Sequence, residues 1–191
     1  MKSLVGSKKE WICVLVVVVA ALLGVGFVQS VLRRLSIDRT KLGVEGITLR
    51  DSLPALLQKW GQPTDYQDAF DGHRDLLWDA HRSALVAPTG EIKKLRGRSL
   101  EFNGRCLFKT GDSTLWVRYQ FGPPESINST GVFWYYQLTS NQRLSIHITG
   151  RIWSIEIGDV RAIKLLEQFY LNEMKKEASL RRRSEALPTP R

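Results

Sequence analysis

Two stretches of the chain share one frame and decide the fold: residues 51–63 read DSLPALLQKWGQP, and residues 112–124 read DSTLWVRYQFGPP. Each stretch opens on Asp-Ser, continues to an aromatic residue, and closes on Gly-x-Pro, at an offset of 61 residues. A second match follows in the same order at an offset of 60, with Thr-Gly at residues 89–90 and again at 149–150. Two ordered matches at nearly one offset predict an internal duplication.

The shared frame describes a short helix with defined ends. A serine at its start can accept a hydrogen bond from a free backbone N–H, and a glycine after the aromatic residue can end the helix in a left-handed conformation. The proline that follows prevents the helix from continuing. The residues assigned to these caps and turns are Ser52, Gly61, Pro63, Ser113, Gly122 and Pro124.

Strands are expected over residues 144–149 and 152–157, because apolar and polar residues alternate there as in half-buried antiparallel strands. Asn103-Gly104, between two apolar runs, is typical of a two-residue hairpin turn. In the last predicted strand the alternation places Trp153 on the same face as Ile155 and Ile157. We therefore expect a short helix followed by an antiparallel meander, used twice, in a first repeat over residues 46–97 and a second over 98–158. The predicted fold class is α+β.

These turns resemble those of the small envelope assembly lipoproteins and of the β-lactamase inhibitory protein. The resemblance rests on Gly111-Asp112-Ser113, on Phe121-Gly122-Pro123-Pro124 and on the aromatic strand that follows, and it covers about residues 46–158. It implies a tandem-repeat domain with a non-enzymatic, protein-binding role.

Residues 11–32 contain no charged residue, and about 20 apolar residues in a helix are enough to cross a bilayer. The sequence therefore predicts a transmembrane signal anchor after an N-terminal tail of residues 1–10, which makes the chain a single-pass membrane protein in contact with the lipid bilayer. A cleaved signal peptide, which would leave a secreted protein, is the alternative. Basic residues flank both sides equally, but a short N-terminal tail favours an extracytoplasmic position for the rest of the chain.

The remaining segments are a linker over residues 33–45, a C-terminal helix over 159–178 and a basic disordered tail over 179–191. The formal net charge of the chain is +9, but residues 35–158 contain fifteen basic and thirteen acidic residues, a net charge of only +2. The basic residues therefore concentrate near the predicted anchor and in the tail. This distribution favours contact with anionic lipid and argues against a nucleic-acid surface on the folded domain.

The densest group of potential metal ligands lies between Asp65 and Asp79. Its spacing matches no EF-hand loop, and no HExxH motif occurs, so a solvated acidic loop is the alternative to a metal site. His147 and Cys106 have no motif-level catalytic partner, and Cys106 is expected to be buried. We expect no catalytic residue and no cofactor; the weak metal candidates are Asp68, Asp71, His73 and Asp75.

The aromatic run Phe133-Trp134-Tyr135-Tyr136 lies on a predicted strand and places rings on both of its faces. One face can enter the core, whereas the other either forms a protein interface or is covered by the C-terminal helix. We therefore expect a membrane-anchored, non-catalytic protein-binding module of the cell envelope, with an assembly, inhibitor or immunity role, and these four residues at its interface. The alternative is an envelope hydrolase or metal-dependent enzyme that uses the Asp65–Asp79 loop.

Overall fold

The computed structural model describes residues 37–185, together with Val19 and Gly24. Strands are the largest class of secondary structure in this part of the chain, and they form two antiparallel sheets. The smaller sheet has the strand order β2-β1-β7-β8, and the larger has the order β3-β4-β5-β6-β12-β11-β10-β9. Every pairing in both sheets is antiparallel.

The strands of the smaller sheet are two hairpins that precede the short helices. They are β1 (Leu42–Val44), β2 (Ile47–Thr48), β7 (Ser99–Phe102) and β8 (Arg105–Lys109). The turn expected at Asn103-Gly104 joins β7 to β8, and both of its residues have positive φ, as a type I′ turn requires.

The strands of the larger sheet form two four-stranded meanders. The first consists of β3 (Asp65–Asp68), β4 (Arg74–Leu77), β5 (Ser83–Val86) and β6 (Ile92–Gly97). The second consists of β9 (Ser126–Ile127), β10 (Phe133–Gln137), β11 (Gln142–Thr149) and β12 (Arg151–Asp159). Pairing between β6 and β12 joins the meanders into one continuous sheet.

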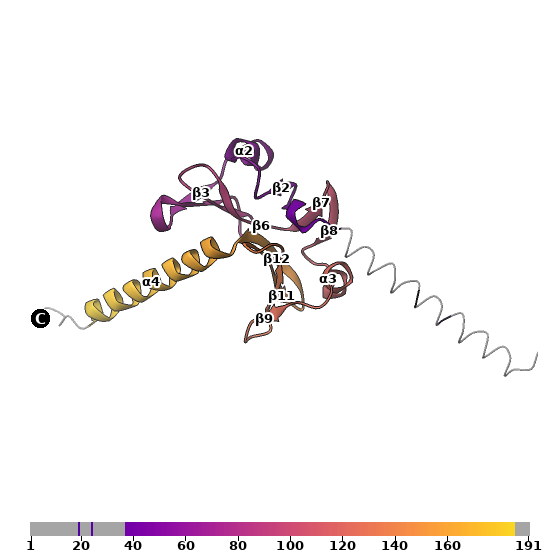
Figure 1. Cartoon of the computed structure of the whole chain (residues 1–191). Helices are drawn as coiled ribbons and strands as arrows, with labels where there is room; N and C mark the ends of the chain where they lie inside the picture. Colours follow the sequence, from indigo (N-terminus) through magenta and orange to yellow (C-terminus); the bar gives the residue numbers. More distant parts are fainter. Residues whose placement is uncertain (1–18, 20–23, 25–36, 186–191) are drawn as a thin grey trace, which may run out of the picture.

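The α-helices of residues 37–185 are α2 (Leu53–Trp60), α3 (Thr114–Phe121) and α4 (Val160–Glu185), and short 3-10 turns occur at Arg39–Lys41 (η1) and Phe70–Gly72 (η2). In Figure 1 α2 and α3 lie beside different halves of the β-structure, and α4, in orange and yellow, extends away from it.

The two halves of the chain have the same order of elements. Each contributes a hairpin, a helix of eight residues and a four-stranded meander, and the two sheet orders are symmetric about the β1–β7 and β6–β12 pairs. One hydrogen bond recurs in both halves: an aromatic side chain donates to the carbonyl of the glycine that ends the helix. Trp78 Nε1 lies 3.0 Å from the Gly61 oxygen, and Tyr136 Oη lies 3.2 Å from the Gly122 oxygen.

The helix ends show how this frame is built. Ser52 Oγ accepts a hydrogen bond from the Ala55 amide at the start of α2, and Ser113 Oγ accepts one from the Leu115 amide at the start of α3. Gly61 and Gly122, which precede Pro63 and Pro124 by two residues, end the helices with φ of 79° and 86°. Their ψ values, −172° and −165°, are extended rather than left-handed helical, a conformation that is essentially restricted to glycine.

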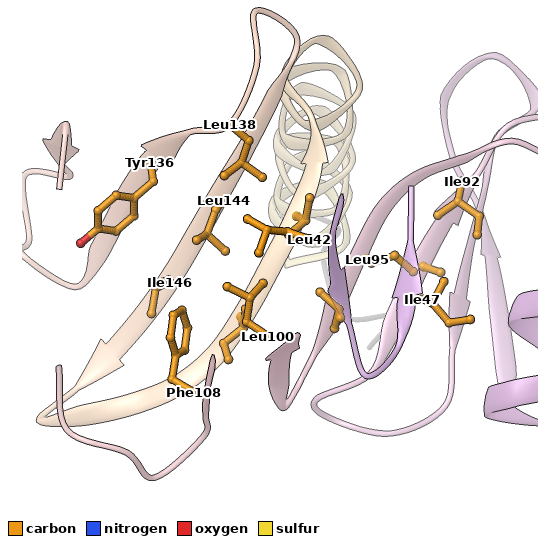
Figure 2. Close-up of a cluster of buried hydrophobic side chains, with 14 of the residues drawn as sticks. Leu42, Ile47, Ile92, Leu95, Leu100, Phe108, Tyr136, Leu138, Leu144 and Ile146 are labelled. Atoms are coloured by element: carbon orange, nitrogen blue, oxygen red, sulfur yellow. The ribbon is translucent and has the colours of Figure 1, made fainter. Parts of the chain in front are cut away.

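One hydrophobic core lies between the two sheets and the short helices. Figure 2 shows side chains of both sheets gathered in it: Leu42, Ile47, Leu100 and Phe108 from the smaller sheet, and Ile92, Leu95, Tyr136, Leu144 and Ile146 from the larger. A separate small cluster joins Leu85 of β5 to Ala162 and Leu166 of α4. The first turns of α4 therefore pack on the outer face of the larger sheet, which is the face turned away from the main core.

The predicted fold class was wrong. The described structure is mostly β rather than α+β, because the hairpins before each helix pair with each other into a second sheet and the two meanders share one larger sheet. Strand β1 belongs to this second sheet although it lies in the stretch that we interpreted as a linker. The C-terminal helix continues to Glu185, beyond the expected end at residue 178.

The transmembrane part of that prediction also needs correction. Among the described residues, no helix combines the length and the hydrophobicity needed to span a bilayer, so the transmembrane, single-pass and signal-anchor assignments are not supported. The predicted stretch 11–32 lies outside the described residues except for Val19 and Gly24, and the tails 1–10 and 186–191 lie outside them as well.

Candidate functional site

Strand β10 separates its four aromatic residues onto two faces. Trp134 and Tyr136 are buried in the core, where the Tyr136 ring lies 5.6 Å from the ring of Phe121. Phe133 and Tyr135 are half-buried on the outer face of the larger sheet. Only these two of the four predicted interface residues therefore lie where a partner could reach them.

The outer face carries a connected row of rings around Phe133. The Phe133 ring is parallel to that of Tyr135 at 6.4 Å and stacks on the imidazole of His147 at 4.5 Å. His147 in turn meets Trp153 edge to face at 4.9 Å, and Trp153 lies 5.2 Å from His81. The consecutive strands β10, β11 and β12, together with His81 from the connection between β4 and β5, thus supply one continuous aromatic surface, of which Trp153 is 39% exposed.

A β-bulge places Trp153 on this surface. Ser154 pairs with His147 and Ile152 pairs with Ile148, so Trp153 has no partner opposite it on β11. The extra residue lets Trp153 and Ser154 both face outward, although they are neighbours in sequence. The alternation that grouped Trp153 with Ile155 and Ile157 was therefore wrong: both isoleucines are buried in the core.

The rings border a hollow of about 280 Å³ on the outer face of β10, β11 and β12. Strand β6 and helix α4 form its other walls, through Arg96 and Glu167 respectively. The complete lining is Arg96, Phe133, Tyr135, Arg143, Ser145, His147, Trp153, Ser154, Glu156 and Glu167. The aromatic rings and arginines of this lining are residue types that protein interfaces favour, whereas its two serines and two glutamates are types that interfaces contain less often.

Strand register brings the polar members of the hollow into a row. Ser145 lies opposite Tyr135 on one side and opposite Glu156 on the other, and Glu156 lies opposite Arg96. Three buried polar atoms of the lining have no hydrogen-bond partner in the described part of the chain: Arg96 Nε, Arg143 Nε and Ser145 Oγ. A buried polar atom without a partner is costly, and such atoms are rare in folded proteins.

Two arginines and two glutamates line the hollow beside the rings. Burial, and then the nearby charge of Arg96, lower the pKa of His147, so its imidazole stays neutral to a lower pH than usual. Burial raises the pKa of Tyr135, although the charge of Arg143 opposes that shift, and the Arg143 guanidinium carbon lies 4.5 Å from the centre of the Tyr135 ring. The arginines therefore act directly on the row of rings: Arg143 makes a cation–π contact with Tyr135, and the charge of Arg96 acts on His147.

A polar cluster underlies α4 next to the hollow. The Lys94 ammonium lies 3.9 Å from carboxylates of both Asp75 and Glu156. Tyr170 of α4 donates a hydrogen bond to Asp75 at 3.1 Å, and burial together with the Asp75 charge raises its pKa to about 12. This cluster fixes α4 against the first meander, so that the hollow lies beside the helix rather than beneath it.

The candidate metal ligands do not form a common site. Asp68 pairs with Arg74 at the edge of the sheet, His73 stacks on Phe70, and Asp75 belongs to the cluster under α4. Asp71 lies in η2 with a φ of 49°. Within the described residues, no group of three or more His, Cys, Asp or Glu side chains is placed to hold a metal ion. Cys106 is exposed on β8 rather than buried.

Sequence reasoning missed His147, Trp153, Arg96 and Arg143 as members of this site. The alternation of His147 with Leu144, Ile146 and Ile148 was a usable signal that its side chain faces away from the core. The contribution of Arg96 depends on the β6–β12 pairing, which joins residues 60 positions apart and has no local signal in the sequence.

Comparisons with known proteins give distant structural similarity only. No family model and no curated protein matches the sequence. An extracellular protein containing an SCP domain from Bacillus anthracis is 10% identical, with a TM-score of 0.48 over 62% of this chain and 46% of that protein. A cysteine-rich secretory protein from Staphylococcus aureus is 14% identical, with a TM-score of 0.40 over 59% of this chain and 45% of that protein. The chain thus matches less than half of the length of either protein.

Proposed function

We propose that this chain is a non-catalytic, extracytoplasmic protein-binding module, and that it binds its partner through the outer face of β10, β11 and β12. The observation that carries the proposal is the row of rings from Tyr135 to Trp153 around a hollow with unpartnered polar atoms. An assembly, inhibitor or immunity role agrees with this surface, and it is also the role that the resemblance to envelope assembly lipoproteins and to the β-lactamase inhibitory protein implies.

The hollow is large enough for a side chain or two of a partner. Its volume of about 280 Å³ is at the lower end of the range of about 300–1,000 Å³ that is typical of small-molecule pockets. Rigid aromatic side chains are favoured at the centres of protein interfaces because they bury much area and lose little conformational entropy. Phe133, Tyr135 and Trp153 supply such anchors here.

Site-specific photo-crosslinking tests the proposed surface. Tyr135 is replaced by p-benzoylphenylalanine in the full chain, which is expressed in cells of its own organism. We expect a crosslink to a defined protein, and we expect its loss when Trp153→Ala is added, because that change removes a neighbouring anchor without entering the core.

The matched control carries the same probe at Trp116 of α3, another aromatic residue, which is 52% exposed and outside the hollow. Equal crosslinking from position 135 and position 116, or crosslinking at 135 that survives the loss of Trp153, would contradict the assignment of the surface. Protease digestion of intact and permeabilised cells tests the extracytoplasmic position. An added protease should cleave residues 37–185 while the cytoplasmic membrane is still intact, after any outer layer of the cell has been opened.

A further inference from the structure

The polar side of the hollow is built from groups that lack a partner. Ser145 is only 6% exposed, and its hydroxyl makes no hydrogen bond within the described chain. The Nε atoms of Arg96 and Arg143 are buried and equally unpartnered. Two of these atoms are donors, and a hydroxyl both donates and accepts, so the group that would complete them is rich in oxygen acceptors.

The charges around the hollow are unevenly matched. Glu156 lies 3.9 Å from Lys94, and Glu167 lies 3.9 Å from a terminal nitrogen of Arg143. Among residues 37–179, whose side chains the structure describes, Arg96 has no carboxylate within ion-pair distance, although Glu156 lies opposite it on β12. Besides burial, the charge of Arg96 contributes to the lowered pKa of His147, which lines the same hollow.

We propose that the hollow is a subsite for a single carboxylate of an acidic segment in the protein partner, bound by Arg96, Arg143 and Ser145. This inference rests on the proposed function, and it names the chemistry of the group that the partner contributes. Guanidinium groups bind carboxylates through parallel, charge-assisted hydrogen bonds, and Ser145 Oγ adds a further donor. The neighbouring rings would contact the residues that flank the acidic one.

A single carboxylate fits better than a phosphate chain. Glu156 and Glu167 line the same hollow, so a polyanion laid across it would place repeated charges beside two carboxylates. One carboxylate aimed at Arg96 avoids that repulsion, because Glu156 is shared with Lys94 and Glu167 is turned toward Arg143. The low net charge of residues 35–158 also disfavours a nucleic-acid partner.

Peptide selection tests the inference directly. Random 12-residue peptides displayed on phage are selected against the immobilised full chain, and only peptides whose binding is lost with the Tyr135→Ala chain are kept. We expect these peptides to share an Asp or Glu. A synthetic copy with that residue changed to Asn or Gln should bind about tenfold to a hundredfold more weakly, as loss of a charge-assisted hydrogen bond predicts.

The protein side of the test uses Arg96→Gln. This variant should bind the acidic peptide more weakly by a similar factor, and its affinity for the Asn or Gln copy of the peptide should equal that of the unchanged chain. Arg105→Gln is the matched control, because Arg105 is an exposed arginine on β8 of the smaller sheet. If Arg96→Gln does not fold, the acid-to-amide change in the peptide still decides the question, because it leaves the protein intact.

The outcomes separate this inference from the function on which it rests. Peptides that need Tyr135 but contain no shared carboxylate, or that bind Arg96→Gln as well as the unchanged chain, overturn the carboxylate subsite and leave the binding surface standing. Failure to obtain any peptide that depends on Tyr135 counts against both.

Discussion

Trp134 and Tyr135 are neighbours in sequence, but the structure predicts opposite consequences for their replacement by alanine. Trp134 is 8% exposed and packs in the main core, and the Arg118 guanidinium carbon lies 5.0 Å from the centre of its ring. Tyr135 is half-buried on the outer face, where its ring contacts Phe133 and Arg143. Trp134→Ala should therefore destabilise the fold, and Tyr135→Ala should chiefly remove a binding anchor.

The magnitudes follow from these two environments. Removing a buried tryptophan costs about 3–5 kcal/mol, because the transfer free energy of the ring is lost and the cavity left behind adds a further cost. Removing Tyr135 forfeits a partly exposed cation–π contact, which is worth about 0.5–1 kcal/mol. In a chain of this size 1 kcal/mol shifts Tm by about 2–4 °C, so Trp134→Ala should lower Tm by about 6–20 °C and Tyr135→Ala by a few degrees at most.

Urea denaturation followed by circular dichroism measures both free energies of unfolding, and thermal melting checks their order. Partner crosslinking from a probe at position 153 supplies the functional readout, which Tyr135→Ala should abolish. Equal loss of stability in the two variants would refute the assignment of the strand faces. A stable Trp134→Ala chain that had lost its partner would show that Trp134, and not Tyr135, faces the interface.

Three further variants test other parts of the fold. Gly158→Ala should destabilise the chain by about 1–3 kcal/mol in urea titrations, because the new Cβ would lie 2.8 Å from Ile163 Cδ1, and Ile163→Val should restore part of the loss. Tyr170→Phe should cost about 1–3 kcal/mol by leaving Asp75 without its hydrogen bond. Because the pKa of Tyr170 is raised, its protonated form stabilises the folded state fully below the ordinary tyrosine pKa of 10, and this contribution is lost as the pH rises toward 12. Absorbance at 295 nm should therefore show a late-titrating tyrosine, in addition to Tyr135, that this variant lacks. Gly122→Ala should lower stability by about 1–3 kcal/mol, measured by urea denaturation, since φ of 86° with extended ψ strains any residue with a Cβ.

The repeated frame predicts the helix ends and turns, but it does not predict which strands pair with each other. Serine caps, glycine ends and the Asn103-Gly104 turn depend on neighbours within a few residues, so the sequence predicts them by itself. The fold class was wrong because β6 pairs with β12 and β1 pairs with β7 over long separations. Nothing in a single strand states which distant strand lies beside it.

The candidate site was predictable only in part, for a similar reason. Alternation along residues 133–136 identified aromatic residues on two faces but did not say which face enters the core. A single bulge at His147 reversed the expected side of Trp153, since one extra residue exchanges the faces of a strand. The arginines became part of the site only through the register of four adjacent strands.

The duplication itself explains why one outer face remains available. The offset of 60 makes Lys94 of β6 equivalent to Ser154 of β12. Lys94 pairs with Leu85 and Ser154 pairs with His147, so Leu85 and His147 occupy equivalent positions in the two halves. Leu85 is fully buried beneath α4, whereas His147 belongs to the open row of rings. Because α4 has no counterpart between the two meanders, only one of two equivalent faces is covered by the described chain. The uncovered face is the one that carries the row of rings and the unpartnered polar atoms, and it is therefore the face on which the proposed binding surface lies.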